Sequence, residues 1–137
     1  MIQILLASHG PLAGAMKETI RFILGKKDNI HTLCAYVDND SMDLEALVDK
    51  WVSRMEEEST WVVLTDVFGG SVNNEFMNRL SQKKFHLLAG MNLPLLAELA
   101  AYKDIPDENE IKRILSDARA SIQYCSPPDR DDGEDEF

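Results

Sequence analysis

The chain has 137 residues, of which 45% are hydrophobic, and a formal net charge of −10. This length predicts one compact domain with a substantial core, and the charge argues against nucleic acid or an anionic membrane as partner. No apolar run is long enough to cross a bilayer, and the N-terminus shows no export signal. Cys34 and Cys125 lie far apart without metal-type spacing, which fits a reducing cytoplasm.

Strand-like and helix-like patterns alternate along the chain. Short apolar runs predict strands at residues 2–7, 30–37, 61–65 and 84–89. Apolar residues at helical spacing predict helices at residues 12–24, 44–55, 71–80, 94–99 and 107–122. Strands separated by helices of this length favour right-handed crossovers. We therefore expect an α/β three-layer sandwich with a mostly parallel, doubly wound sheet and helices on both faces.

Capping residues mark the ends of several of these helices. Gly25 is suited to end the first helix, and Ser41 and Ser71 are suited to cap the second and third. Pro94 suits the first turn of the fourth helix. Asp107 begins a capping-box-like pattern for the last helix, whose inward face is expected to run from Ile111 to Ile122.

The end of the chain differs in composition from the rest. The residues after Pro127 and Pro128 carry six acidic side chains against Arg130, a net charge of −5. Such a segment has almost nothing to bury and is expected to be disordered. We therefore predict one domain over residues 1–125 and an acidic disordered tail over residues 126–137.

Residues able to bind ligands or take part in catalysis follow the predicted strands. His9, Asp66 and Asn92 each follow a predicted strand. The carboxyl ends of parallel strands share one edge of a sheet, where such folds bind their ligands. A carboxylate beside an imidazole fixes its tautomer and stabilises its cationic form. We expect His9 and Asp66 to meet if their strands are neighbours; taken singly, each could also be an ordinary turn residue.

A glycine-rich segment follows Asp66 closely. Gly69, Gly70 and Ser71 at a helix start would supply backbone N–H groups and a hydroxyl that can bind phosphoryl oxygens, although Gly69 and Gly70 alone would also suit a flexible loop. His31 and His86 lie in predicted strands without a partner pattern. The combination favours a phosphoryl group carried on His9.

The sequence contains no Walker loop, no dinucleotide-binding glycine pattern and no metal-ligand spacing. We therefore expect no metal and no cofactor, and a phosphoryl group supplied by another protein.

Three motifs resemble the IIA components of the mannose–fructose–sorbose family of the bacterial sugar phosphotransferase system. They are Ala7-Ser8-His9-Gly10, Thr65-Asp66-Val67-Phe68-Gly69-Gly70-Ser71 and Gly90-Met91-Asn92-Leu93-Pro94-Leu95. The resemblance extends over roughly the first 120 residues. Where the family often has Pro-Phe-Asn after the Gly-Gly-Ser segment, this chain has Val72-Asn73-Asn74.

The resemblance implies a cytoplasmic phosphotransferase. His9 would accept a phosphoryl group from the phosphocarrier protein HPr and pass it to a separate IIB chain, with Asp66 as its carboxylate partner. Phe68 and Asn92 would contribute to partner docking, and contact with the membrane IIC and IID components would be only indirect. Family members also resemble dimers that exchange a C-terminal strand, for which 121–125 is the candidate segment.

Two other functions are compatible with the same residues. One is the relay subunit that phosphorylates a dihydroxyacetone kinase, which resembles this fold but usually departs from the Asp-x-x-Gly-Gly-Ser segment. The other is a non-catalytic module that binds an anion in the same place. The sequence does not name the sugar.

Overall fold

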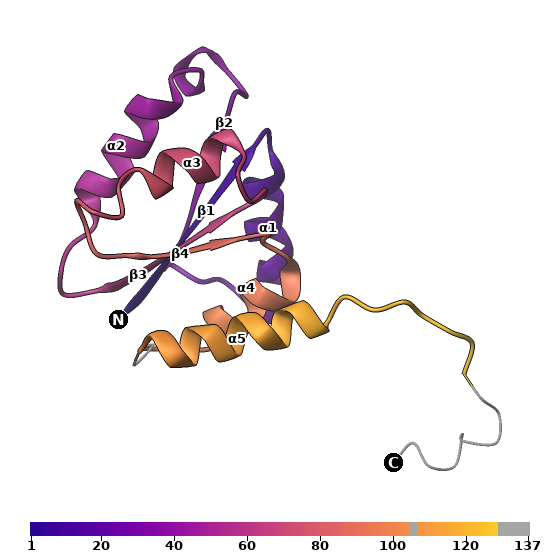
Figure 1. Cartoon of the computed structure of the whole chain (residues 1–137). Coiled ribbons are helices and arrows are strands. Elements are labelled where there is room, and N and C mark those ends of the chain that lie inside the picture. Colours follow the sequence, from indigo (N-terminus) through magenta and orange to yellow (C-terminus); the bar gives the residue numbers. More distant parts are fainter. Residues whose placement is uncertain (105–106, 129–137) are drawn as a thin grey trace.

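The protein forms a four-stranded, all-parallel sheet with helices on both faces (Figure 1). The computed structural model describes residues 1–104 and 107–128. The strands, β1 (Ile2–His9), β2 (Ile30–Ala35), β3 (Thr60–Thr65) and β4 (His86–Ala89), lie in the order β2-β1-β3-β4. This arrangement confirms the predicted α/β class and its doubly wound parallel sheet.

Alternate residues along each strand serve two separate cores. Ile4 and Leu6 of β1 face the helices α1 (Leu12–Leu24), α4 (Leu93–Ala100) and α5 (Glu108–Ala120). Leu5 and Ala7 face α2 (Leu44–Arg54) and α3 (Ser71–Met77). Because both sheet faces are covered, the strands are almost continuously apolar, as is typical of parallel sheets. In Figure 1, α2 and α3 lie above the sheet, and α4 and α5 lie below it.

The connection between β2 and α2 differs from the prediction. Strand β2 ends at Ala35 and not at residue 37, because Tyr36 adopts a φ of 66°. Ser41 does not cap α2; it lies buried in a 3-10 turn, η1 (Asn39–Ser41). Asp43 caps α2 instead, accepting a hydrogen bond from the N–H of Ala46.

Two predicted apolar faces are narrower than their patterns indicated. Met16 and Ile20 of α1 and Phe76 of α3 are buried. Other residues assigned to these faces are substantially exposed, namely Leu12, Ile23, Leu24, Met77 and Leu80. The helices lie on the surface of a small domain, so only the central stripe of each one reaches the sheet.

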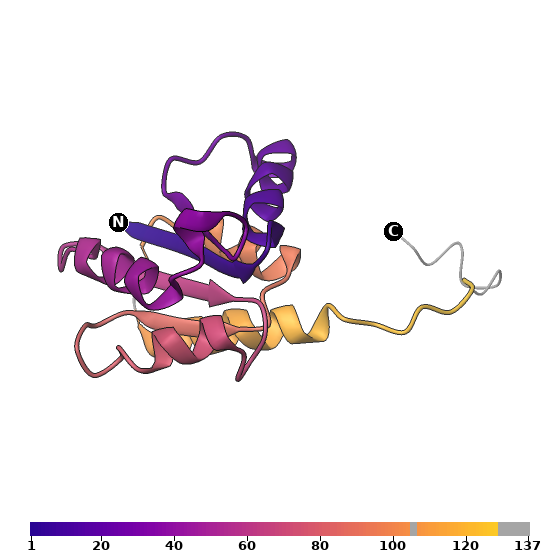
Figure 2. The same ribbon diagram turned by 90° about the horizontal axis from the view of Figure 1, so that it is seen from above.

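The C-terminal part confirms the predicted cap and corrects the predicted end of α5. Asp107 accepts a hydrogen bond from the N–H of Glu110, and α5 ends at Ala120. Ile122, which the pattern placed on the inner face, is 77% exposed. Residues 122–128 have no regular secondary structure and extend away from the domain (Figure 2). Most of the predicted acidic tail, residues 129–137, lies outside the described residues.

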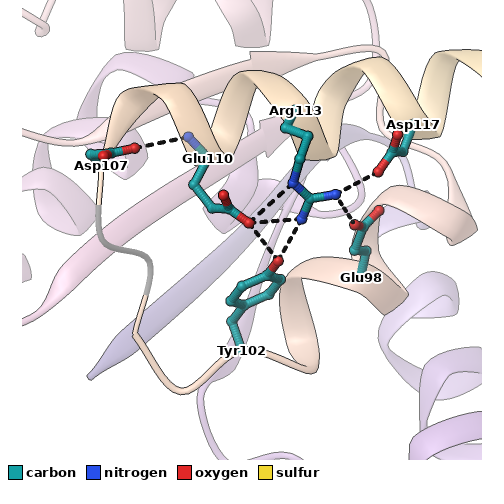
Figure 3. Close-up of polar contacts among 6 residues, drawn as sticks. All are labelled: Glu98, Tyr102, Asp107, Glu110, Arg113 and Asp117. Atoms are coloured by element: carbon teal, nitrogen blue, oxygen red, sulfur yellow. Dashed lines mark hydrogen bonds and ion pairs between the residues drawn. The ribbon is translucent and has the colours of Figure 1, made fainter.

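A charged cluster links α5 to the end of α4. The guanidinium of Arg113 donates to Glu110 Oε1 at 2.7 Å, to the hydroxyl of Tyr102 at 2.6 Å and to Glu98 Oε1 at 3.4 Å (Figure 3). Asp117, one turn further along α5, accepts from the same guanidinium at 2.7 Å. The hydrogen bonds from Arg113 and Tyr102 hold the pKa of Glu110 below its ordinary value. This cluster ties the end of α4 and Tyr102 to α5.

Within the described ranges, 1–104 and 107–128, no helix is long and apolar enough to cross a membrane.

Candidate functional site

His9 and Asp66 meet at the carboxyl edge of the sheet. His9 is the last residue of β1, and Asp66 follows β3, the strand paired with β1 on one side. The chain leaves β1 towards α1 on one face and leaves β3 towards α3 on the other face. The two residues therefore stand at a topological switch point, where open α/β sheets form their ligand-binding crevices.

One carboxylate oxygen of Asp66 holds His9 at two points. Asp66 Oδ2 lies 2.8 Å from the His9 backbone nitrogen and 2.8 Å from ring Nδ1. The other oxygen, Oδ1, accepts from the N–H of Val67 at 2.9 Å. Both the ring and the backbone of His9 are thus fixed relative to β3.

The environment of Asp66 keeps it ionised. Its side chain is only 9% exposed, and burial alone would raise its pKa. The hydrogen bonds from the His9 backbone, the His9 ring and Val67, together with the charge interaction with His9, outweigh burial and lower the pKa of Asp66 below its ordinary value. An ionised carboxylate can only accept hydrogen bonds, so Nδ1 of His9 must carry the proton in this contact.

The second ring nitrogen of His9 faces a hydroxyl. Nε2 lies 3.0 Å from Ser71 Oγ. With the proton on Nδ1, a neutral ring has its lone pair on Nε2, and Ser71 is then the donor. The His9 side chain is 42% exposed, so this nitrogen belongs to the protein surface rather than to a deep cavity.

Ser71 does not have the capping role that the sequence predicted. It is the first residue of α3, and Gly70 occupies the N-cap position without a side-chain cap. The hydroxyl of Ser71 is directed to His9 instead. The first N–H groups of α3 therefore have no capping side chain, a state in which a helix start can bind negative charge.

The glycine segment is more tightly bonded than a flexible loop. The N–H of Gly69 donates to Asn73 Oδ1 at 3.1 Å, and the N–H of Gly70 donates to the Val67 carbonyl at 3.1 Å. A Cβ at Gly70 would lie 3.4 Å from His9 Cε1. Gly70 therefore allows the imidazole a close approach, while the N–H groups of both glycines are already used within the loop.

Asn73 is a structural residue of the site that the sequence reasoning missed. It is 2% exposed, and its amide donates to Thr65 Oγ1 at 3.0 Å while it accepts from Gly69. It thereby joins the end of β3 to the loop and α3. A buried amide with both hydrogen-bonding groups satisfied makes a rigid support.

The two residues expected at a docking surface have different surroundings. Phe68 is 80% exposed, two residues after Asp66. Asn92 caps α4, accepting from the N–H of Leu95 at 2.9 Å, which gives it a structural role in addition to any contact with a partner. His31 and His86 are remote from His9: they lie in β2 and β4, and burial lowers the pKa of each.

At the switch point of the parallel sheet, a carboxylate holds the imidazole and a hydroxyl lies beside its free nitrogen. This arrangement defines a histidine site suited to nucleophilic group transfer. Comparison with known proteins places the chain in a family. The family model described as PTS system fructose IIA component matches residues 3–116. The chain belongs to the IIA components of the mannose–fructose–sorbose type of the sugar phosphotransferase system (PTS), which have a phosphotransfer role in sugar uptake.

Individual relatives agree with this assignment. The chain is 25% identical to the fructose-specific EIIA component of Bacillus subtilis over 131 residues, 92% of this chain and 88% of the relative. It is 33% identical to the sorbose-specific EIIA component of Lacticaseibacillus casei over 102 residues, 72% of each chain. A solved Klebsiella pneumoniae protein, assigned to a phosphoenolpyruvate-dependent PTS permease, is 44% identical, with 90% of each chain covered and a TM-score of 0.82.

Proposed function

We propose that the protein is a phosphohistidine relay that accepts a phosphoryl group from HPr on Nε2 of His9 and passes it to a IIB component in the cytoplasm. The observation that supports this proposal most strongly is that the two ring nitrogens of His9 have different partners. Asp66 Oδ2 lies 2.8 Å from Nδ1 and accepts its hydrogen bond, whereas Nε2 lies 3.0 Å from the rotatable hydroxyl of Ser71. Nε2 is therefore the nitrogen whose lone pair is available for attack.

The chemical step requires little from the protein beyond position and charge. The Nε2 lone pair of His9 forms a bond to phosphorus while the phosphorus–nitrogen bond of phosphorylated HPr breaks, and the HPr histidine keeps the electron pair. The His9 proton stays on Nδ1, where Asp66 balances the positive charge that develops on the ring. Donor and acceptor are both phosphoramidates, so catalysis consists of alignment and stabilisation of the phosphoryl oxygens.

Ser71 supplies the nearest donor for those oxygens. Its hydroxyl leaves the Nε2 lone pair when the phosphoryl group arrives and can then donate to a phosphoryl oxygen. The first turn of α3 has no side-chain cap, so its backbone N–H groups would be further donors for the phosphoryl oxygens. The exposed side chains of Val67 and Phe68 adjoin the site and are suited to contact a protein donor.

The test is incubation with phosphorylated HPr followed by mass mapping. We expect one acid-labile, base-stable phosphoryl group on His9, absent from His9→Ala and retained when His31 and His86 are both replaced by alanine. A non-catalytic anion-binding module would take up no covalent phosphate. Phosphate retained in His9→Ala would refute the assignment of the site. Subsequent transfer to a IIB chain, and not to a dihydroxyacetone kinase, would distinguish the two relay functions.

We also propose that the protein is a homodimer that exchanges its C-terminal segment. In the part of the chain that the structure describes, β4 is an edge strand that pairs with β3. A hollow of about 500 Å³ is lined in part by Leu88 of β4, Phe68 and Ile122. Tyr124, in the extended segment that follows, is 97% exposed. Residues 121–125 of a second copy would pair with β4 and cover this edge. Light scattering should give the dimer mass for the full chain and the monomer mass for a chain ending at Ala120; a monomeric full chain would refute this proposal.

A further inference from the structure

Tyr36 also lies at the site, although no sequence motif indicated this residue. It directly follows β2, the neighbour of β1 on the side away from β3. Its hydroxyl lies 3.2 Å from Ser71 Oγ, and its ring centroid lies 5.8 Å from that of His9, with the planes tilted by 41°. Tyr36 thus reaches His9 from the opposite side to Asp66.

The backbone holds Tyr36 in a conformation that tyrosine rarely adopts. Within residues 1–104 and 107–128, Tyr36 is the one residue other than glycine with a positive φ, at 66°. A non-glycine residue in this region is strained, and it persists only where its surroundings impose it. Such outliers are found preferentially at functional sites.

The turn that follows Tyr36 supplies this constraint. The N–H of Tyr36 donates to the Ser41 carbonyl at 3.0 Å. The N–H groups of Val37 and Asp38 both donate to Ser41 Oγ at 2.9 Å, and Asp38 Oδ1 accepts from the N–H of Ser41 at 2.8 Å. Ser41 is 7% exposed. A buried serine therefore fixes the turn that directs Tyr36 to the site.

The polarity of the hydrogen bonds follows from the ionised carboxylate. Asp66 accepts, so Nδ1 of His9 donates, and in the neutral ring Nε2 has the lone pair. Ser71 must then donate to Nε2, which leaves the oxygen of Ser71 free to accept. Tyr36 is consequently the donor to Ser71, and the chain of bonds runs Tyr36 to Ser71 to His9 to Asp66.

We propose that Tyr36 is a positioning residue for phosphoryl transfer, acting through Ser71; this inference rests on the proposed relay function. When the phosphoryl group approaches Nε2, the Ser71 hydroxyl must turn its hydrogen from the ring nitrogen to a phosphoryl oxygen. The hydrogen bond from Tyr36 keeps the Ser71 oxygen in place during this turn. It also strengthens Ser71 as a donor, because a hydroxyl that accepts a hydrogen bond donates a stronger one.

The test compares Tyr36→Phe, Ser71→Ala and the double variant by single-turnover phosphorylation at increasing concentrations of phosphorylated HPr. We expect Tyr36→Phe to lower the maximal rate by about threefold to tenfold, the range that corresponds to one neutral hydrogen bond, without changing the half-saturating concentration. In the Ser71→Ala background, Tyr36→Phe should have no further effect. The imidazole ¹⁵N shifts of His9 should also change in Tyr36→Phe.

Tyr102→Phe is the matched control, because it removes a hydrogen-bonded hydroxyl from the opposite end of the sheet, beside Met1 and Ile2. It should leave the maximal rate unchanged.

Three results would overturn the inference. An unchanged maximal rate in Tyr36→Phe would exclude a role in transfer, and a raised half-saturating concentration alone would assign Tyr36 to docking. Equal effects of Tyr36→Phe with and without Ser71 would show that it acts independently of Ser71. Failure of the wild-type chain to be phosphorylated on His9 would instead refute the proposed function.

Discussion

Replacement of Asp66 by asparagine tests the site most sharply, because the shape of the side chain is kept while one acceptor is lost. In the wild-type protein the two carboxylate oxygens accept three N–H groups, from the His9 backbone, the His9 ring and Val67. An asparagine has one oxygen and one NH₂ group, which only donates. Either orientation of the amide therefore sets a donor against a donor.

The two orientations have different consequences. If the amide oxygen faces His9, the N–H of Val67 loses its acceptor. If the NH₂ group faces His9, the backbone N–H of His9 loses its acceptor and the ring is driven to the tautomer with its proton on Nε2, where no lone pair remains for attack. In both cases one N–H group loses its carboxylate acceptor at a solvent-exposed contact. A hydrogen bond to a charged group contributes about 1.5–3 kcal/mol, and less where water can replace the lost acceptor.

We therefore expect Asp66→Asn to lower the free energy of unfolding by about 1–3 kcal/mol and the rate of phosphorylation by about 10²–10⁴-fold, the usual effect of an orienting or acid–base group. Urea denaturation and single-turnover transfer from phosphorylated HPr measure the two quantities. Because the folded state lowers the pKa of Asp66, its contribution to stability is present above the unfolded pKa and lost as the pH falls through the folded value. The difference in stability between wild type and variant should accordingly shrink below about pH 4.

Asp43→Asn is the matched control. Asp43 caps α2 through the N–H of Ala46, and asparagine caps helices equally well. This variant should unfold and accept phosphate like the wild type. A transfer rate for Asp66→Asn within threefold of wild type, together with the expected loss of stability, would show that Asp66 only holds the loop and would refute its role in orienting His9.

Three further predictions concern the support of the site and the pH dependence of stability. Asn73→Ala should lower the free energy of unfolding by about 1–3 kcal/mol in urea, because the N–H of Gly69 loses its buried acceptor; an unchanged midpoint would contradict this role. Gly70→Ala keeps its backbone N–H and its φ of −73°, but its Cβ would lie 3.3 Å from the Val67 carbonyl oxygen and 3.4 Å from His9 Cε1. A small shift of the His9 ring should slow single-turnover transfer while the melting temperature changes little. A wild-type rate would show that the ring tolerates the added methyl group. Burial, with repulsion from nearby cations, lowers the pKa of His31 from 6.5. The free energy of unfolding should therefore fall as the pH decreases from about 6.5 through the folded pKa, and His31→Gln should flatten this part of the pH profile. An equal slope in the variant would assign the pH dependence to other groups.

The sequence by itself determined the elements and the two central residues of the site. Apolar runs and helically spaced apolar residues are local patterns that can be read without knowledge of the fold. A helix must bury one apolar stripe and a central strand both of its faces, whichever elements lie next to them. The same patterns put His9 and Asp66 at strand ends. A parallel sheet brings all its carboxyl ends to one edge, so a site at that edge could be predicted without knowledge of the strand order.

Only the tertiary structure decided which of the surrounding residues contact His9 and which support the fold. The order β2-β1-β3-β4 sets β1 between the strands that precede Tyr36 and Asp66. Asp66 therefore bonds His9 directly, while the Tyr36 ring lies 5.8 Å from the His9 ring. A left-handed tyrosine gives no periodic signal, and Ser41 and Ser71 suit a helix cap in any sequence. Whether a serine caps a helix or donates to a histidine 62 residues away is determined by which acceptor the folded chain brings within 3.0 Å. That choice depends on long-range packing and side-chain rotamers, which no local pattern contains.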